Sequence, residues 1–368
     1  MPLAVVVEKA QIDRPRSLET VLKAASHFSA PVLGTALSIL IGLAGGAVLM
    51  AAFGHNPGHA YASLFKGGFI GTFEIASTLA RAAPILLAAL TFTIGVRARM
   101  LNLGMEGQAY FGAVGAVVIG GVLTLPPVLH IVVTMAVAMV FGALWALPAA
   151  LLKVWRGVNE ILSTLMLNYV ALFITTLITV NHLTGPGTGD RSVKIRESAR
   201  FSELVEFSGL TYAIVIAAAA CVLVYLYLWR TKPGFALRLT GTSPDAARYA
   251  GINAKRIVLL SLIGGGLFAG LGGALQIIGR PPLWVLRVDM LNVLNLGWNG
   301  VAVALIGRSH PLGVIPAGIF FAGLLSGAKI MQLEAGVAVE LVSAVRGIIV
   351  VALAIPGIIA LVRWRFKR

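Results

Sequence analysis

The amino-acid sequence predicts an all-α protein that crosses a membrane about ten times as a bundle of helices. Three observations predict it: an apolar composition, ten separate apolar segments, and an uneven distribution of basic residues between the loops. Hydrophobic residues occupy 58% of the 368 positions and charged residues only 12%, and the mean hydropathy is +0.92. Soluble domains carry roughly twice that share of charge. A bilayer solvates such apolar surface directly, whereas a soluble fold of this length could not cover it.

The apolar segments divide the chain into spans and loops. They cover about 32–53, 72–96, 104–123, 125–152, 159–182, 210–229, 257–278, 291–307, 312–330 and 337–361. The 42 glycines allow close packing of helices where lipid gives no hydrophobic drive. We expect a cytoplasmic tail over 1–30 and a transmembrane domain over 31–368, which contains a long cytoplasmic loop over 230–256.

The loop charges predict the orientation of the chain. With the N-terminus placed in the cytoplasm, 19 of the 29 Lys and Arg residues lie on the inside, eight lie outside and two lie within spans. Cytoplasmic loops of membrane proteins carry the excess of basic residues, so both termini are predicted to be cytoplasmic. The net charge of +15 is therefore a topology signal and does not indicate a nucleic-acid partner.

A short repeat joins the third and eighth predicted spans. Leu101-Asn-Leu-Gly-Met-Glu-Gly107 and Leu294-Asn-Leu-Gly-Trp-Asn-Gly300 are identical at five of seven positions. The copies are five spans apart, an odd number, so they would run in opposite directions across the membrane. Inverted repeats of this kind frame the pathway in many transporters, with broken helices near the site. Chance matching in a glycine-rich chain is the alternative.

Polar side chains inside predicted spans are candidate pathway residues, because burying them is costly unless they are paired or face water. The candidates are Asn102, Glu106, Gln108, Asn159, Glu160, Asn168, Trp298 and Asn299. We expect five of them to converge on one water-accessible cavity, namely Asn102, Glu106, Gln108, Asn168 and Asn299. The alternatives are that Asn102 and Glu106 cap the third span and that the others make ordinary hydrogen bonds between helices.

The cytoplasmic loop contains the signature of a two-turn helix. Ser243 is a good N-cap and Pro244 suits the first helical position. Asp245 complements the positive helix end, and Gly251 can adopt the left-handed conformation after the last turn. Such a helix is too short to span and suits docking onto a soluble partner, with an ordinary loop as the alternative. The candidate docking residues are Ser243, Pro244, Asp245, Ala246, Ala247, Arg248, Tyr249 and Gly251.

Signatures of catalysis are missing from the sequence. There is no Gly-x-x-x-x-Gly-Lys-Ser/Thr loop, so the chain is not expected to hydrolyse ATP itself. His55 and His59 are separated by a turn-forming Asn-Pro-Gly, which argues against a metal site. The single cysteine, Cys221, excludes an internal disulfide. We therefore predict no catalytic residues, no metal and no bound cofactor.

Four segments of the chain resemble the permease subunits of bacterial nucleoside-type ABC importers. These belong to a wider group that serves branched-chain amino acids and simple sugars. The segments are Asn102-Leu-Gly-Met-Glu-Gly-Gln108, Gly157-Val-Asn-Glu-Ile-Leu-Ser-Thr-Leu-Met-Leu-Asn-Tyr169, Gly241-Thr-Ser-Pro-Asp-Ala-Ala-Arg-Tyr-Ala-Gly-Ile252 and Gly300-Val-Ala-Val-Ala-Leu-Ile-Gly-Arg-Ser-His-Pro-Leu-Gly313. The bulky Trp298 departs from the pattern, where a smaller residue is expected.

The resemblance implies a multi-pass permease of the bacterial inner membrane that imports nucleosides, with purine nucleosides as the first expectation. It also implies a second homologous permease, a separate ATPase that uses ATP and Mg, and a periplasmic or lipoprotein substrate-binding protein. Residues 242–251 would form the helix that receives the ATPase stroke. The alternatives are the same machine with a simple sugar or branched-chain amino acid as cargo, and an ion-coupled secondary transporter. The last would need an acidic core site, and the spans offer little beyond Glu74, Glu160 and Glu340.

Overall fold

The computed structural model describes residues 18–365 of the 368-residue chain, apart from Pro186, Thr188 and Leu283, and the side chains of 34–352 within that range. The first 17 residues of the expected N-terminal tail lie outside the described part. Helix α1 begins at Leu18, within the expected tail over 1–30, and its apolar stretch begins at Gly34.

The described chain is built of helices, which confirms the all-α class. They are α1 (Leu18–Ala52), α2 (Pro57–Phe69), α3 (Thr72–Arg97), α4 (Met105–Val117), α5 (Pro127–Arg156), α6 (Glu160–Ile178), α7 (Ala213–Arg230), α8 (Lys232–Thr242), α9 (Pro244–Tyr249), α10 (Ala254–Ile278), α11 (Leu296–Ile306), α12 (Pro311–Ala335) and α13 (Val339–Arg365). Short π-helical turns over Val118–Val122 and Thr179–Leu183 extend α4 and α6.

Seven helices of the described chain are long and apolar enough to cross a membrane: α1 over Gly34–Ala52, α3, α5, α6 with its extension, α7, α10 and α12. The expected count of ten spans is not confirmed. The segment expected to span at 291–307 is helical only over Leu296–Ile306, because residues 291–295 form turns. Eleven residues at 1.5 Å each reach about 16 Å, roughly half of a bilayer's hydrocarbon core.

Two helices lie where loops were expected. The Asn56 side chain caps α2, its Oδ1 accepting from the backbone N–H groups of Gly58 at 3.0 Å and His59 at 3.2 Å. Thr231 caps α8, accepting from the Gly234 N–H at 3.1 Å. In both helices a proline follows in the first two positions. This is the same cap-and-proline pattern that predicts α9, and it was present in the sequence.

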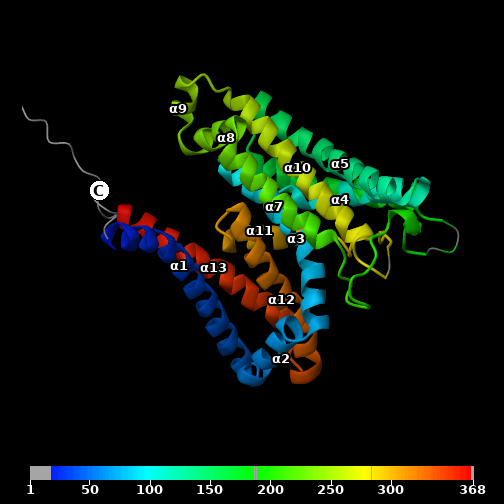
Figure 1. The fold of residues 1–368 in the computed structure, drawn as a ribbon, viewed down its shortest axis with the longest axis horizontal. Coiled ribbons are helices and arrows are strands. Elements are labelled where there is room, and N and C mark those ends of the chain that lie inside the picture. The colour runs from blue at the N-terminus through cyan, green and yellow to red at the C-terminus, as the bar shows by residue number, and fades with distance from the viewer. Residues whose placement is uncertain (1–17, 186, 188, 283, 366–368) are drawn as a thin grey trace, which may run out of the picture.

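Helix α3 lies at the centre of the bundle and is buried along most of its length. It packs against α7 and α10 on one side and against α11 and α12 on the other (Figure 1). Helices α4, α5 and α10 form the most closely packed group, while α1 packs on α13 and α2 on α12. The bundle core therefore lies around α3 and the broken helices α4 and α11 that flank it.

The molecule has two distinct ends (Figure 1). Helices α8 and α9, the start of α1 and the end of α13 lie at one end, whereas α2 and the described parts of the loops over 184–212 and 279–295 lie at the other. We call the second the loop end. The described parts of residues 190–196 run alongside 284–288 there, with the Ser192 N–H donating to the Leu286 carbonyl at 2.8 Å.

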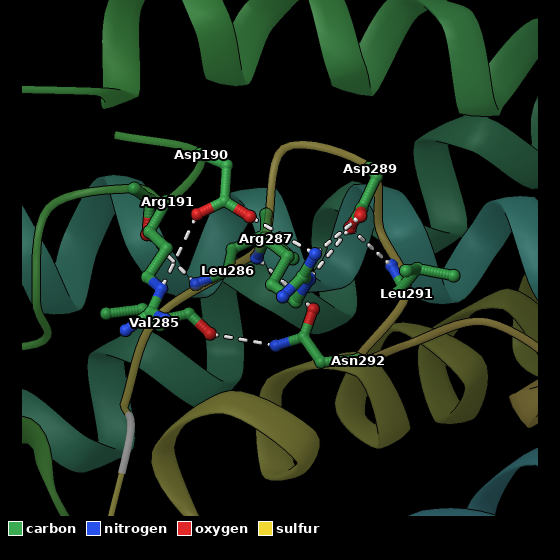
Figure 2. Close-up of polar contacts among 9 residues, drawn as sticks. Asp190, Arg191, Val285, Leu286, Arg287, Asp289, Leu291 and Asn292 are labelled. Carbon is green, nitrogen blue, oxygen red and sulfur yellow. Dashed lines mark hydrogen bonds and ion pairs between the residues drawn. The ribbon is translucent and has the colours of Figure 1, made fainter. Parts of the chain in front are cut away.

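Figure 2 shows how ionic contacts hold this pair of loop segments together. The Arg287 guanidinium donates to both carboxylate oxygens of Asp289, at 3.0 and 2.8 Å, and lies 3.1 Å from Asp190. Hydrogen bonding from Arg287 lowers the pKa of the Asp289 carboxyl. The Asn292 side chain donates to the Val285 carbonyl at 2.8 Å. These bonds connect residues 285–292 to one another and to Asp190, shortly before α11 begins.

Candidate translocation site

The two repeat segments meet at the centre of the bundle. Glu106, in the first turn of α4, is only 5% exposed. Its carboxylate accepts hydrogen bonds from the Asn295 N–H and from the Gly297 N–H, the latter at 2.6 Å. The first N–H groups of a helix lack partners within it and carry positive partial charge. Glu106 therefore caps α11, and not the start of the third span, which was the alternative considered for it.

The conformation of the residues before α11 makes this cap possible. Asn295 adopts a left-handed conformation, with φ of +64°, so the chain turns sharply into α11. The Tyr110 hydroxyl, one turn beyond Glu106, donates to the same carboxylate at 3.1 Å. The charge is thus held by three donors from two helices, which offsets the cost of burying it.

Helices α4 and α11 run in opposite directions from this meeting point. The far end of α4 reaches the loop end, where the Gly120 carbonyl accepts from the Arg196 N–H at 2.8 Å. The far end of α11 reaches the end that carries α8, where Arg97 Nε donates to the Ser309 carbonyl at 2.9 Å. This is the relative direction that the repeat predicts.

Side chains of α6 satisfy the irregular backbone that precedes α4. Asn168 Oδ1 accepts from the Gly107 N–H at 2.9 Å, and its Nδ2 donates to the Leu103 carbonyl at 2.8 Å. The Thr164 hydroxyl accepts from the Leu103 N–H at 3.2 Å. Exposed backbone groups are tolerated at membrane depth only when protein or water satisfies them. Asn168 thereby allows α4 to begin inside the bundle.

Four other candidates use their polar groups locally. Asn102 and Gln108, both almost fully buried, bond each other through their amides at 3.3 and 3.4 Å. Asn159 caps α6 by accepting from the Ile161 N–H at 2.9 Å. Glu160 forms an ion pair with Lys153 at 2.7 Å. Each of these contacts satisfies the polar side chain within the protein, so its position is explained without a bound cargo.

A cavity of about 220 Å³ opens beside the capped start of α11. We call it the aromatic cavity, because Tyr110, Tyr169 and Trp298 line it together with Glu106 and Asn168. Leu165, Leu172 and Leu294 complete the wall. The Trp298 side chain is 48% exposed and Tyr169 is 60% exposed, so both are accessible from outside the bundle.

Asn299 lies in a different cavity, so the expectation that five polar side chains share one cavity is wrong. That second cavity, of about 380 Å³, is lined by Arg81, Gln276, Arg280 and Asn292 in addition to Asn299. Consecutive helical residues point about 100° apart, because a turn holds 3.6 residues. Trp298 and Asn299 therefore face different sides of α11. Leu294 contributes to both cavities and lies between them.

The sequence reasoning missed Tyr110, Tyr169 and the arginines of the second cavity. Tyr110 had a readable signal, since a residue four positions after Glu106 lies on the same helix face. Tyr169 also had one, because it directly follows Asn168. Arg81 and Arg280 had been assigned to a span and a loop by their place in the sequence, and only the fold brings α3 to the end of α10.

The short helix expected in the polar loop is confirmed as α9. The Ser243 hydroxyl accepts from the Ala246 N–H at 3.4 Å, Pro244 occupies the first turn, and Gly251 is left-handed with φ of +72°. Ala247 is buried, whereas Tyr249 is 94% exposed and Asp245 and Arg248 are also exposed. One face of α9 thus anchors it to the bundle and the other is free.

Comparison with known protein families identifies the family to which this chain belongs. A family model described as "Branched-chain amino acid transport system / permease component" matches residues 74–354. The chain belongs to this permease family. The matched region contains both cavities, the repeat segments and α9, so the site lies within the part of this permease that the family shares.

Three relatives resemble this permease over most of its length. The guanosine ABC transporter permease protein NupP of Bacillus subtilis is 31% identical over 94% of this chain and 99% of its own. The nucleoside ABC transporter permease protein NupB of Lactococcus lactis is 32% identical over 89% and 92%. The glucose ABC transporter permease protein TsgB13 of Haloferax volcanii is 30% identical over 86% and 85%. This permease is a translocation subunit of an ABC importer.

Proposed function

We propose that the permease imports nucleosides into the cytoplasm, with purine nucleosides as the preferred cargo. The aromatic cavity is the observation that carries this proposal. A purine base presents flat faces that stack on Tyr and Trp rings, and its edge offers donors and acceptors to hydroxyl and amide groups. Tyr110, Tyr169 and Trp298 supply the rings, and Asn168 retains one free N–H on its amide.

The position of the cavity suits weak binding during passage. It lies where α4 and α11 both begin, and discontinuous helices of this kind line the sites of many transporters. Trp298, a candidate pathway residue at a position where the family pattern has a smaller one, forms part of its wall. The names of the two nucleoside relatives support the same cargo, and the glucose relative supports a sugar as the second candidate.

The proposed importer requires partner chains in addition to this permease. We infer that α9 receives an ATPase chain, which uses ATP and Mg, through its exposed Asp245, Arg248 and Tyr249. A second permease would cover the exposed apolar face of α6 next to the aromatic cavity, which includes Met166 at 49% and Phe173 at 74% exposure. A binding protein would deliver cargo at the loop end. This arrangement places α8, α9 and both chain ends in the cytoplasm.

Uptake by whole cells tests the cargo. The permease is produced, together with the other subunits of its importer, in a bacterium that lacks its own nucleoside uptake. We expect accumulation of labelled guanosine, and a Trp298→Ala variant with lowered uptake. A Leu312→Ala variant, which removes an exposed side chain of α12 outside the cavity, is the matched control. Uptake of labelled glucose without guanosine would contradict the nucleoside proposal and favour the sugar.

A further inference from the structure

Basic side chains gather at two adjoining cavities near the loop end. Arg81 of α3, Arg280 after α10 and Lys329 of α12 line a cavity of about 330 Å³. Arg81 and Arg280 also line the second cavity described above, of about 380 Å³. We call the two together the basic cavities. Arg81 is close enough to Arg280 and to Lys329 for the positive charges to repel one another.

These charges have no directly paired carboxylate among the described residues. Within the described residues, none of the three cations forms an ion pair with Asp or Glu. Glu74 contributes to one wall, but its carboxylate lies against Gly71 at the start of its own helix. Further along, Arg200 and Lys194 lie 4.8 and 5.8 Å from the Trp284 ring and add positive charge. Arg81 and Arg280 are only partly exposed, and unpaired charges that are partly removed from water are costly.

The basic cavities also contain hydrogen-bond donors that lack acceptors. Arg81 Nε, Trp284 Nε1 and the Ser326 hydroxyl are buried without any partner, and each of these residues lines one of the cavities. The acceptors nearby are already engaged. Gln276 Oε1 accepts from Arg280 at 3.4 Å, and Asn292 Oδ1 accepts from the Arg287 N–H at 3.2 Å. Arg81 Nε and Trp284 Nε1 can only donate, and they lie among three cations, so the matching ligand supplies acceptors and negative charge.

We propose that the basic cavities bind a phosphate group. Two guanidinium groups present planar pairs of donors that match phosphate oxygens, a geometry for which arginine is preferred to lysine. The phosphate belongs either to a small soluble phosphate ester that reaches the cavities from the loop end or to the headgroup of an anionic lipid. This site is separate from the aromatic cavity and does not depend on the nucleoside proposal.

Binding to the purified full-length chain in detergent tests the site. The probes are inorganic phosphate and guanosine 5′-monophosphate, with guanosine as the neutral comparison. We expect Arg81→Gln and Arg280→Gln to weaken binding of both phosphate probes by about tenfold or more, because each removes charge-assisted hydrogen bonds. Arg191→Gln is the matched control, since Arg191 is exposed at the loop end, lies outside both cavities and, among the described residues, forms its ion pair with Asp190. It should leave binding unchanged.

A second measurement needs no variant and so does not depend on folding of the mutants. Phenylglyoxal modification of the wild-type chain is mapped by mass spectrometry, and phosphate is expected to protect Arg81 and Arg280 but not Arg191. Nanodiscs containing phosphatidylglycerol separate the two sources: lowered phosphate binding there identifies a lipid headgroup, and unchanged binding identifies a soluble phosphate. Failure of the wild-type chain to bind either phosphate probe, with no protection of the two arginines, would overturn the proposal.

Discussion

At the scale of single residues, Glu106 is the group on which the site depends most. An isolated buried carboxylate is very costly, and it is tolerated only when hydrogen bonds replace its lost hydration. Here the backbone of α11 and the Tyr110 hydroxyl provide those bonds. The carboxylate in turn satisfies N–H groups that a half-length helix leaves open inside the bundle. One side chain thus stabilises both broken helices.

Glu106→Gln should destabilise the protein, because the amide keeps one acceptor and turns an NH₂ group toward an N–H donor. We expect a loss of about 1–3 kcal/mol, the cost of an unsatisfied buried group. Thermal unfolding in detergent measures it. Glu160→Gln is the control, since its partly exposed ion pair with Lys153 contributes about 1 kcal/mol or less. Equal stability of E106Q and the wild type would refute the role of Glu106 as the cap of α11.

At the scale of helices, glycines set how closely α10 approaches its neighbours. A Cβ atom on Gly270 would overlap the Ala138 carbonyl oxygen of α5, and one on Gly273 would overlap the Ala109 carbonyl oxygen of α4. The backbones therefore touch directly, which is the close packing that the glycine-rich composition predicts. This close packing keeps α4 in place beside α10 and so positions Glu106.

Gly270→Ala tests this contact, with Gly264→Ala on the same helix as the matched control. An added methyl group at position 270 forces α10 away from α5, and overpacking of this kind costs about 1–3 kcal/mol. Position 264 has open space around its would-be Cβ. Alanine there should be neutral or stabilising by up to about 1 kcal/mol, because it favours the helix. Similar melting temperatures for the two variants would show that the helices are not in direct contact.

At the scale of the whole molecule, the sequence predicted the class and several details for physical reasons. The membrane class follows from hydropathy and loop charge, and α9 follows from a local capping pattern. Both could therefore be predicted from the sequence without the fold. The true length of α11 could not, because Leu291, Val293 and Leu294 extend the apolar run of the helix they precede. Nor could the separation of Asn299 from Glu106, which depends on the rotation of α11, or the gathering of Arg81 and Arg280.

The orientation of the molecule can be tested with single cysteines, because the native Cys221 is buried. Glu206→Cys places a thiol at the loop end and Tyr249→Cys places one on α9, and both positions are exposed. We expect a membrane-impermeant maleimide to label the first in intact cells and the second only after permeabilisation. The reverse pattern would contradict the cytoplasmic placement of α8 and α9.

The central claim is that ATP hydrolysis by a partner ATPase, transmitted through α9, drives import through this chain. The most direct measurement is guanosine accumulation in proteoliposomes that contain the complete importer and enclose ATP and Mg, with the binding protein outside. We predict concentrative uptake that needs enclosed ATP and is abolished by Arg248→Asp, which changes the exposed face of α9 without disturbing the buried Ala247. Arg156→Asp, an exposed position at the end of α5, should keep uptake. Accumulation without ATP, or normal uptake by the Arg248→Asp variant, would contradict the account.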